Sequence, residues 1–472
     1  MGFINKLFKK VRGNASAIEA HDPSSGPRII GRDQHAISRR DISDSALKVL
    51  YRLKDAGYQA YLVGGGVRDL LLGGEPKDFD IATDAHPEQV HKLFRNSILI
   101  GRRFRLVHVR FGREIIEVAT FRANHTSDNS DNQARQADSG MLTRDNVYGT
   151  VDEDALRRDF TINAMYYNIN GFTIHDFANG LEDIQNRTVR MIGDPYERYR
   201  EDPVRMLRAI RFAAKLDFYI ADETGDPIDE LGHLLEPIPA ARMFEEILKL
   251  FLAGQGEATY ELLQDYNLFR YLFPQTQAAI EADESAEQLV ETFILRALRN
   301  SDERISHGKS VTPAFLLAAF LWHPLQARVA KIRNMPPVPA LHQAAQDVIQ
   351  EQVKSTSIPR RFSTPMKEIW DMQIRLPRRH GNRAQQLLEN KRFRAGYDFL
   401  LIREAAGEEL EDLGEWWTSF QYAGDSQRME MTKALGKAPR PKRKRKASKS
   451  GNATDDATDS AADMNSAVSP AE

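Results

Sequence analysis

The chain has 472 residues, of which 41% are hydrophobic, so it is long enough to form about two to four domains with real cores. Its 65 basic and 67 acidic residues nearly cancel, and its lack of cysteine excludes disulfides, thiolate nucleophiles and cysteine-ligated zinc. No apolar stretch is long enough to span a membrane or to act as a signal peptide, and we therefore expect a cytoplasmic protein.

The N-terminal segment, residues 1–33, is predicted to begin with a short amphipathic helix and to continue as a linker. The apolar residues of this helix share one face, and its lysines lie largely elsewhere: Phe3, Ile4, Leu7, Phe8 and Val11. Two interpretations stay open. The apolar face makes a weak peripheral contact with an anionic membrane, or the segment is a frayed or docking helix.

Residues 34–195 alternate short helices and strands, which predicts a small domain built on a mixed sheet. A hairpin is expected around Gly112 and Arg113. Residues 123–146 are rich in Asn, Asp, Ser and Gln, so we expect a mobile loop inserted in this domain. The expected helices cover residues 46–53 and 67–72, and the expected strands cover residues 59–63, a stretch around Phe79, 97–100, 105–111 and 115–121.

After Tyr196 the apolar spacing becomes helical, which predicts an all-α neck at 196–275 and an all-α body at 276–430. The predicted fold class is therefore α+β, a small mixed-sheet head followed by an extended helical region. Trp416-Trp417 is interpreted as helix packing. His175-Asp176 is interpreted as a strand end, because no second His-Asp pair follows that a metal-dependent phosphohydrolase would need.

The C-terminal stretch, residues 431–472, lacks core-forming residues and is predicted to be a disordered tail. A basic cluster in it suits RNA phosphates: Lys442, Arg443, Lys444, Arg445 and Lys446. A tail that only aids solubility is the alternative.

A glycine turn followed by carboxylates carries the strongest chemical signal. Three glycines separate an apolar strand from a helix, where backbone N–H groups can approach an anion: Gly64, Gly65 and Gly66. Strand alternation puts Asp78 and Asp80 on one side, and Glu117 interrupts an apolar neighbouring strand. Taken singly, these are an ordinary turn, a solvated strand end and an edge glutamate. Together, at this interval, they predict a site for Mg²⁺.

These motifs, with RRDFTINA at 157–164 and RYREDPVRMLRA at 198–209, resemble the class II tRNA nucleotidyltransferase and poly(A) polymerase family, a branch of the polymerase-beta superfamily. The order and spacing of the motifs are specific. The resemblance is strong over residues 34–273, weak through the helical region, and leaves both termini unexplained.

The resemblance implies roles for individual residues. Asp78, Asp80 and Glu117 would be the catalytic carboxylates and hold two Mg²⁺ ions, and the glycine turn with Arg68 would grip the triphosphate. Four further residues would lie near the sugar and triphosphate: Arg157, Arg158, Asp159 and Asn163.

The base would be read by Asp202 and Arg205, with Arg208 beside them. A carboxylate and a guanidinium complement the N6 donor and N1 acceptor of adenine, and the i,i+3 spacing predicts one helix face for the pair. The alternatives are a helix N-cap for Asp202 and a solvated or RNA-facing stripe for the arginines.

The implied activity is the transfer of AMP from ATP to RNA 3′ ends. The segment 98–109 resembles the one that marks bacterial poly(A) polymerases within the family, and its basic residues suit RNA phosphate: Arg102, Arg103 and Arg105. A CCA-adding tRNA nucleotidyltransferase and a catalytically inactive RNA-binding protein are the alternatives. The expected partners are RNA and ATP, together with RNA-decay or RNA-chaperone proteins, and the chain is expected to be a monomer.

Overall fold

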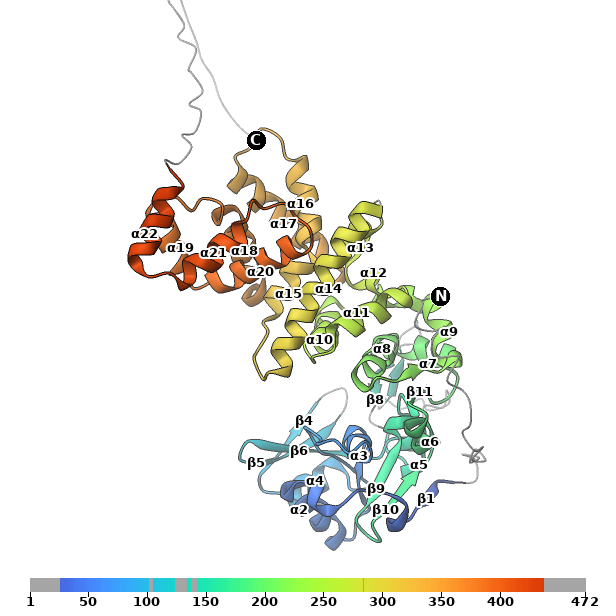
Figure 1. Cartoon of the computed structure of the whole chain (residues 1–472). Helices are drawn as coiled ribbons and strands as arrows, with labels where there is room; N and C mark the ends of the chain where they lie inside the picture. Colours follow the sequence, from blue (N-terminus) through green and yellow to red (C-terminus); the bar gives the residue numbers. More distant parts are fainter. Residues whose placement is uncertain are drawn as a thin grey trace, which may run out of the picture.

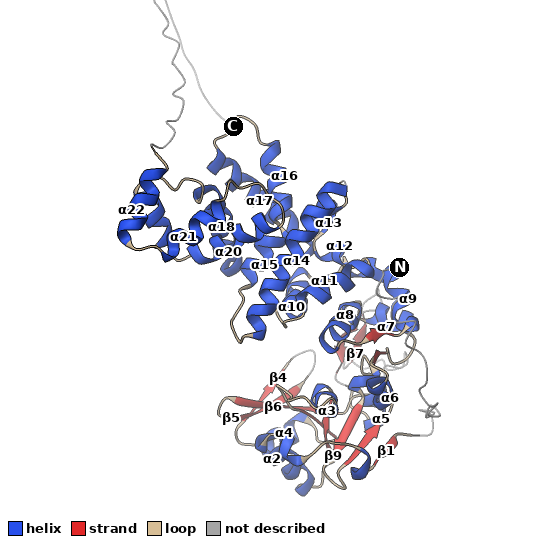
Figure 2. Cartoon of the chain, in the orientation of Figure 1, coloured by secondary structure: helices blue, strands red, loops and turns tan. Residues whose placement is uncertain are grey.

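The structure is a computed structural model that describes residues 26–101, 105–123, 134–136, 142–145, 147–282 and 284–436. A mixed sheet forms the head, and the helical remainder extends away from it (Figure 1), with little strand outside the head (Figure 2). This arrangement confirms the expected α+β class. Several predictions lie outside the described residues: the N-terminal helix, Arg102 and Arg103, most of the loop at 123–146, and the basic cluster of the tail.

The head sheet has eight strands in the order β1-β10-β9-β2-β3-β6-β5-β4. Within it β3 and β6 run parallel, and the other neighbouring strands run antiparallel. The strands are β1 (Arg28–Ile30), β2 (Ala60–Val63), β3 (Asp80–Thr83), β4 (Ser97–Ile100), β5 (Leu106–Phe111), β6 (Glu114–Thr120), β9 (Met165–Asn168) and β10 (Thr173–Asp176).

Alternation along the strands buries a different set of side chains on each face of the sheet. On one face α2 (Asp44–Asp55) and α4 (Pro87–Leu93) cover residues such as Val107 and Val118. On the other face α5 (Val151–Leu156) packs beside Tyr61 and Tyr166, over strands β2 and β9. The two remaining strand pairs lie outside this sheet: β7 (Ala134–Gln136) with β8 (Leu142–Asp145), and β11 (Thr188–Val189) with β12 (Tyr219–Ile220).

Strand β1 corrects the predicted start of the head domain. Residues up to 33 were expected to be linker, but β1 pairs with β10, with Ile29 opposite His175. A three-residue strand in which only Ile30 is buried carries too short a pattern to be recognised from the sequence.

The helical region begins at α7, where Asp194 caps the helix by accepting hydrogen bonds from the Tyr196 and Glu197 N–H groups. Proline at the first turn starts α7, α13, α15 and α17. The helices are α7 (Pro195–Glu201), α8 (Val204–Leu216), α9 (Asp222–Leu231), α10 (Ala240–Phe251), α11 (Gly256–Asp265), α12 (Phe269–Leu272), α13 (Pro274–Ile280), α14 (Glu284–Ser306), α15 (Pro313–Phe320), α16 (Trp322–Lys331), α17 (Pro337–Ser355), α18 (Arg360–Arg375), α19 (Asn382–Leu388), α20 (Phe393–Ala405), α21 (Leu413–Tyr422) and α22 (Asp425–Ala434).

One apolar cluster runs from the head through the helices that follow it, and a smaller cluster joins the C-terminal helices around Trp417. Trp417 is fully buried, which confirms that this aromatic pair packs helices. Asp176 ends β10 and accepts hydrogen bonds from the Gly180 and Leu181 N–H groups, which confirms the strand-end interpretation of the His-Asp pair. Among the described residues, no helix combines the length and apolar character needed to cross a bilayer.

Candidate active site

Two carboxylates lie side by side on the parallel strands at the centre of the sheet. Asp80 begins β3, and the register places Glu117 of β6 directly opposite it. Asp78 precedes Asp80 by two residues, and the buried Phe79 between them points to the other side. Among the described residues, the side chains of Asp78 and Asp80 form no hydrogen bond or ion pair, whereas the Glu117 Oε2 lies 3.5 Å from the His108 Nε2. The three carboxylates therefore border one surface of the sheet.

The electrostatics of this surface favour a cation. Partial burial and the neighbouring charges of Glu117 and Asp78 together raise the pKa of Asp80 to about 6, against the opposing charge of Arg158. The side chain is exposed at its tip, so protein surrounds it only in part. Like charges held together in this way are stabilised when a metal ion binds between them.

The donor set fits Mg²⁺ in part. The available ligands are carboxylate oxygens, which Mg²⁺ prefers, and proteins usually bind this ion through one or two carboxylates with substrate phosphates completing the shell. Asp80 and Glu117 supply such a pair. Within the described ranges, however, no three Asp, Glu, His or Cys side chains converge closely enough to hold an ion unaided. The metal role of Asp78, Asp80 and Glu117 therefore stays a proposal.

The glycine turn brings a buried cation beside this surface. Gly64 precedes α3 (Gly65–Leu71) with φ of +67°, a conformation that other residues rarely adopt. A Cβ atom added there would lie 3.1 Å from the Arg158 Nη1. Arg158 donates through its Nε to the Tyr166 hydroxyl, which in turn donates to Asp154. Burial alone would lower the pKa of Arg158, but Tyr166 and Asp154 raise it, so the guanidinium stays charged.

Replacing Gly64 by alanine is expected to destabilise the protein by about 1–3 kcal/mol through backbone strain and to raise the KM for ATP by displacing Arg158. Gly73 is the matched control, because its φ is +75° and nothing lies within 4 Å of its added Cβ. Both variants should unfold at lower denaturant concentration, and only Gly64→Ala should change the KM. Equal KM values for the two variants would contradict a role of this turn in binding the nucleotide.

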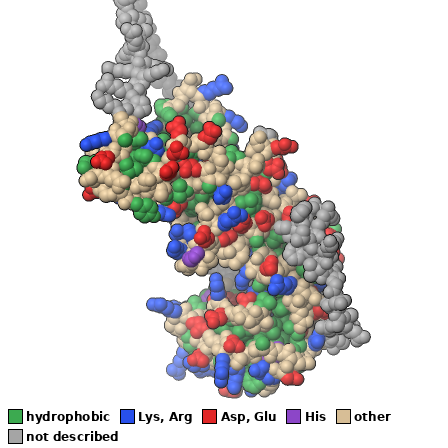
Figure 3. Space-filling view, in the orientation of Figure 1, with side chains coloured by type: hydrophobic (Ala, Val, Ile, Leu, Met, Phe, Trp, Pro, Cys, Tyr) green, Lys and Arg blue, Asp and Glu red, His purple; other side chains and the backbone are tan. Residues whose placement is uncertain are grey.

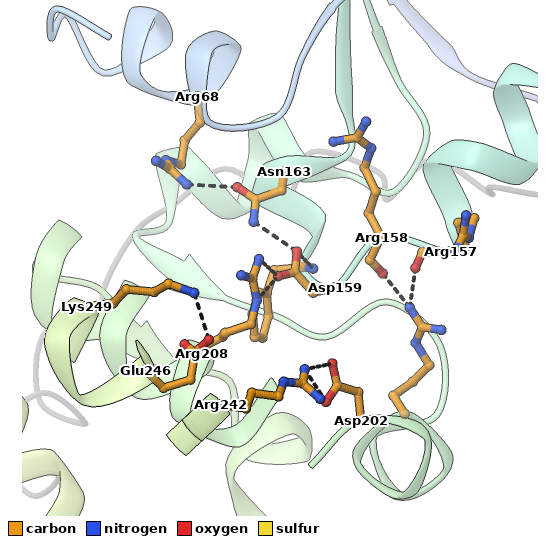
Figure 4. A network of polar contacts seen from close by, with 12 residues as sticks. Arg68, Arg157, Arg158, Asp159, Asn163, Asp202, Arg208, Arg242, Glu246 and Lys249 are labelled. Atoms are coloured by element: carbon orange, nitrogen blue, oxygen red, sulfur yellow. Dashed lines mark hydrogen bonds and ion pairs between the residues drawn. The ribbon is translucent and has the colours of Figure 1, made fainter. Parts of the chain in front are cut away.

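A chain of polar contacts crosses from α3 to α8 (Figure 4). The side chain of Arg68 is 3% exposed and donates to the Asp69 Oδ1 and, at 2.8 Å, to the Asn163 Oδ1. Asn163 donates to the Asp159 Oδ1 at 3.0 Å. Asp159 is also bound by Arg208, whose Nε lies 2.7 Å from its Oδ2. These contacts tie the head to the first long helix of the neck.

This series of polar contacts changes how two predicted residues are interpreted. Arg68 was expected to grip the triphosphate, but its guanidinium is buried against Asp69 and Asn163, and we propose that it positions Asn163 instead. Arg208 was expected beside the base, but it is paired with Asp159. Burial would raise the pKa of Asp159, and Arg208 and Asn163 more than compensate, so that it is lowered to about 2.

The predicted base readers, Asp202 and Arg205, lie at a break between two helices. Helix α7 ends at Glu201 and α8 begins at Val204, so Asp202 is not on the helix face of Arg205, which corrects that expectation. The Asp202 Oδ1 lies 3.4 Å from the Val204 N–H donor, a weak version of the N-cap alternative.

Each reader already has a partner in the structure. Arg242 donates to both carboxylate oxygens of Asp202, at 2.9 and 2.8 Å (Figure 4). Arg205 donates to the Glu201 Oε2 and to the Arg198 carbonyl, both at 2.7 Å. Glu201 directly precedes Asp202 in the sequence and could have been found there. Arg242 comes from α10, and nothing in the local sequence pattern indicates the contact.

Arg198 is a further residue that the sequence did not single out. Its Nη2 donates to the carbonyl oxygens of Arg157 and Arg158, each at 2.6 Å. Burial and the nearby Arg205 lower the pKa of Arg198 to about 10. This side chain fixes the backbone from which Arg158 reaches the glycine turn. Among the predicted RNA contacts, Arg105 is described and forms an ion pair of 2.7 Å with Glu88.

Three family models match successive parts of the chain. Residues 60–190 match the model described as "Poly A polymerase head domain", residues 217–280 match "Probable RNA and SrmB-binding site of polymerase A", and residues 333–450 match "Polymerase A arginine-rich C-terminus". The chain is 50% identical to poly(A) polymerase I of Salmonella typhimurium over 449 residues, which covers 94% of this chain and 96% of that protein. The chain belongs to the poly(A) polymerase I family.

Other relatives separate this family from its neighbours. Poly(A) polymerase I of Haemophilus influenzae is 46% identical over 88% of the chain and 93% of that protein. A CCA-adding enzyme of Lactobacillus helveticus is 39% identical, but over only 48% of the chain and 55% of that protein. Membership of the poly(A) polymerase I family thus rests on nearly the whole length, whereas the sequence likeness to this CCA-adding enzyme covers about half.

The fold is shared more widely than the family. The CCA-adding enzyme of Bacillus stearothermophilus, solved in complex with CTP, has a TM-score of 0.54 and 26% identity, covering 84% of this chain and 88% of that one. A tRNA-processing enzyme in an apo form gives a TM-score of 0.55 at 22% identity, covering 82% of this chain and 100% of that one, which concerns the fold alone.

Proposed function

We propose that this member of the poly(A) polymerase I family adds AMP from ATP to RNA 3′ ends without a template and releases pyrophosphate. The observation that carries the proposal is the pairing of Asp80 with Glu117 on parallel strands, beside the turn at Gly64. An inactive RNA-binding relative would have no need to keep these like charges together. Retention of the carboxylates therefore favours an enzyme.

The reaction would be an in-line displacement, in which the RNA 3′-oxygen attacks the α-phosphorus of ATP as the bond to the β-phosphate oxygen breaks. Bound Mg²⁺ supplies a Lewis acid for the attacking and leaving oxygens, and Asp78, Asp80 and Glu117 would hold it. Arg158 would place its permanent charge against the triphosphate at the glycine turn. Arg198 would keep that arginine in position through two backbone carbonyls.

The base would be read by Arg205 and Asp202. Their partners Glu201 and Arg242 fix both side chains before the nucleotide arrives, which lowers the entropy lost on binding. Arg208 lies one turn further along α8, and its pairing with Asp159 makes it part of the support.

Replacing Arg205 by alanine is expected to raise the KM for ATP by about tenfold to a hundredfold, as for the loss of a hydrogen bond to a charged group. The measurement is single-nucleotide incorporation on a short RNA. Arg200 is the control, because it is an exposed arginine of α7 outside this network. If Arg200→Ala raised the KM as much as Arg205→Ala, the effect would be one of general charge, and base reading by Arg205 would be wrong.

The choice of product is tested by supplying defined RNAs with each nucleoside triphosphate. Continued AMP addition to unrelated single-stranded RNAs supports the poly(A) proposal. Extension that stops after CCA on a tRNA lacking this end would favour the CCA-adding alternative. The shorter likeness to CCA-adding enzymes supports the first outcome.

RNA is the proposed polymer substrate. Figure 3 shows Lys and Arg side chains on both sides of the hollow between the head and the helical region, where a phosphate backbone would be attracted. The match of residues 217–280 to an RNA-binding family model supports contact through the neck. RNA-decay or RNA-chaperone partners, weak membrane contact and a monomeric state remain proposals.

A further inference from the structure

One face of strands β4, β5 and β6 is open to solvent. Helices α2 and α4 cover the other face, on the side away from the neck (Figure 1), where Val107, Val109 and Val118 are buried. On the open face, all the side chains are partly or fully exposed. Three aliphatic residues stand out there: Ile98 of β4 is 45% exposed, Ile100 of β4 is 39% exposed, and Ile115 of β6 is 44% exposed. We call these three residues the aliphatic shelf.

The aliphatic shelf continues the row of side chains that contains the proposed carboxylates. The registers place Asp80 opposite Glu117, Glu117 opposite His108, and His108 opposite Ile98. Ile115 lies two residues before Glu117 on the same face and opposite Arg110. Ile115 thus adjoins Glu117 along β6, and His108 of β5 lies between Glu117 and Ile98.

The row is closed on its other side. There the register places Val63 opposite Asp80 and Tyr166 opposite Val63, and these side chains are 2% and 0% exposed. Along this row, a polymer can therefore reach the carboxylates from the β4–β6 side and not from the side of β2 and β9.

We propose that the aliphatic shelf binds the bases of the last nucleotides of the RNA substrate, and this inference rests on the proposed function. The growing end must lie next to Asp80 and Glu117, and the shelf is the apolar surface that adjoins them. Arg110 is exposed on the same face, and no contact of its guanidinium is found among the described residues, so it can meet a phosphate.

The chemistry of the shelf suits an enzyme that works without a template. Aliphatic side chains contact the flat faces of bases and present no hydrogen-bond donors or acceptors. Contacts with base faces tolerate any sequence, because every base has such a face. The shelf can therefore hold a varied first RNA end and the adenylates added after it.

The test replaces Ile98 and Ile115 by serine, singly and together, in the full chain. For the double variant we expect the KM for RNA to rise about five- to tenfold, with primers ending in A, C or U affected alike. The KM for ATP and the kcat at saturating RNA should stay within about twofold. Ile29→Ser is the matched control, because Ile29 is 52% exposed at the opposite edge strand of the same sheet.

Two results would overturn the inference. The first is an unchanged KM for RNA in the double variant. The second is a double variant that has lost self-association, or contact between the shelf and the rest of the chain, so that this loss accounts for the change in KM. Sedimentation would reveal lost self-association, and limited proteolysis would reveal lost contact within the chain. Fluorescence anisotropy with short RNA and no ATP separates this inference from the proposed function, since it reports shelf binding even if the wild-type protein failed to incorporate AMP.

Discussion

Replacing Asp80 by asparagine is expected to lower the rate of AMP incorporation on the order of a thousandfold and to leave RNA binding unchanged. Asparagine keeps the size of the side chain but removes the charge that would hold Mg²⁺ opposite Glu117. The rate is measured by single-turnover incorporation with saturating ATP and RNA, and binding is measured separately by anisotropy. Undiminished incorporation would refute the metal assignment.

Asp55→Asn is the matched control, because Asp55 is an exposed carboxylate at the end of α2.

Stability gives a second readout for Asp80. Its pKa is raised from 3.8 to about 6, so the folded state favours the protonated form. The associated stability is present below about pH 4 and is lost as the pH rises through 6. Above pH 6, Asp80→Asn should therefore melt at the same temperature as the wild type or higher, while Asp55→Asn should show no such gain.

Breaking the ion pair between Asp159 and Arg208 is expected to destabilise the protein more than any surface substitution. Arg208→Ala leaves the carboxylate of Asp159, 11% exposed, without its counter-charge. Removing one partner of a buried pair costs about 3–5 kcal/mol. Because the pair joins the head to α8, incorporation of AMP should fall as well. The measurement is chemical denaturation, with Arg208→Ala compared to the double variant Asp159→Asn/Arg208→Ala, which should recover part of the loss.

The control for this pair is Arg187→Ala, whose ion pair with Asp217 spans 3.2 Å between side chains that are 68% and 87% exposed. That substitution should cost at most about 1 kcal/mol. If both alanine variants cost the same, the buried pair would have no special role in joining head and neck.

The same pair predicts a pH dependence. The pKa of Asp159 is lowered to about 2, so the carboxylate stabilises the folded state above about pH 4 and this contribution is lost as the pH falls through 2. Asp159→Asn should thus cost about 2 kcal/mol at neutral pH, and this cost should vanish as the pH falls below 2. Melting temperatures of the variant and the wild type should converge in that range.

Sequence patterns were sufficient where the interactions are local. The short apolar run at residues 97–100 was predicted as a strand with the bounds that β4 has, and the turn at Gly112 joins β5 to β6 as expected. Phe79 between two aspartates placed Asp78 and Asp80 on one side. These features depend on alternation and on backbone conformation within a few residues.

The partners of the site residues were beyond the reach of such patterns. Asp202 is bound by Arg242, 40 residues later, and Asp159 by Arg208, 49 residues later. From the sequence, an arginine on a helix is interpreted as a solvated charge. Only the packing of α8 against the head, and of α10 against α8, turns these arginines inward. Arg68 was predicted at the triphosphate because it adjoins the glycine turn, but the fold buries it against Asn163.

The sequence by itself determined the fold class, the residue ranges of several strands, the glycine turn and the carboxylates that follow it. Each of these depends on local periodicity and on residue type. Only the tertiary structure decided which arginines Asp159 and Asp202 contact, where the head begins, and that the face beside Glu117 is left open. Such pairings depend on the angles at which distant elements pack, and no short stretch of sequence contains those angles.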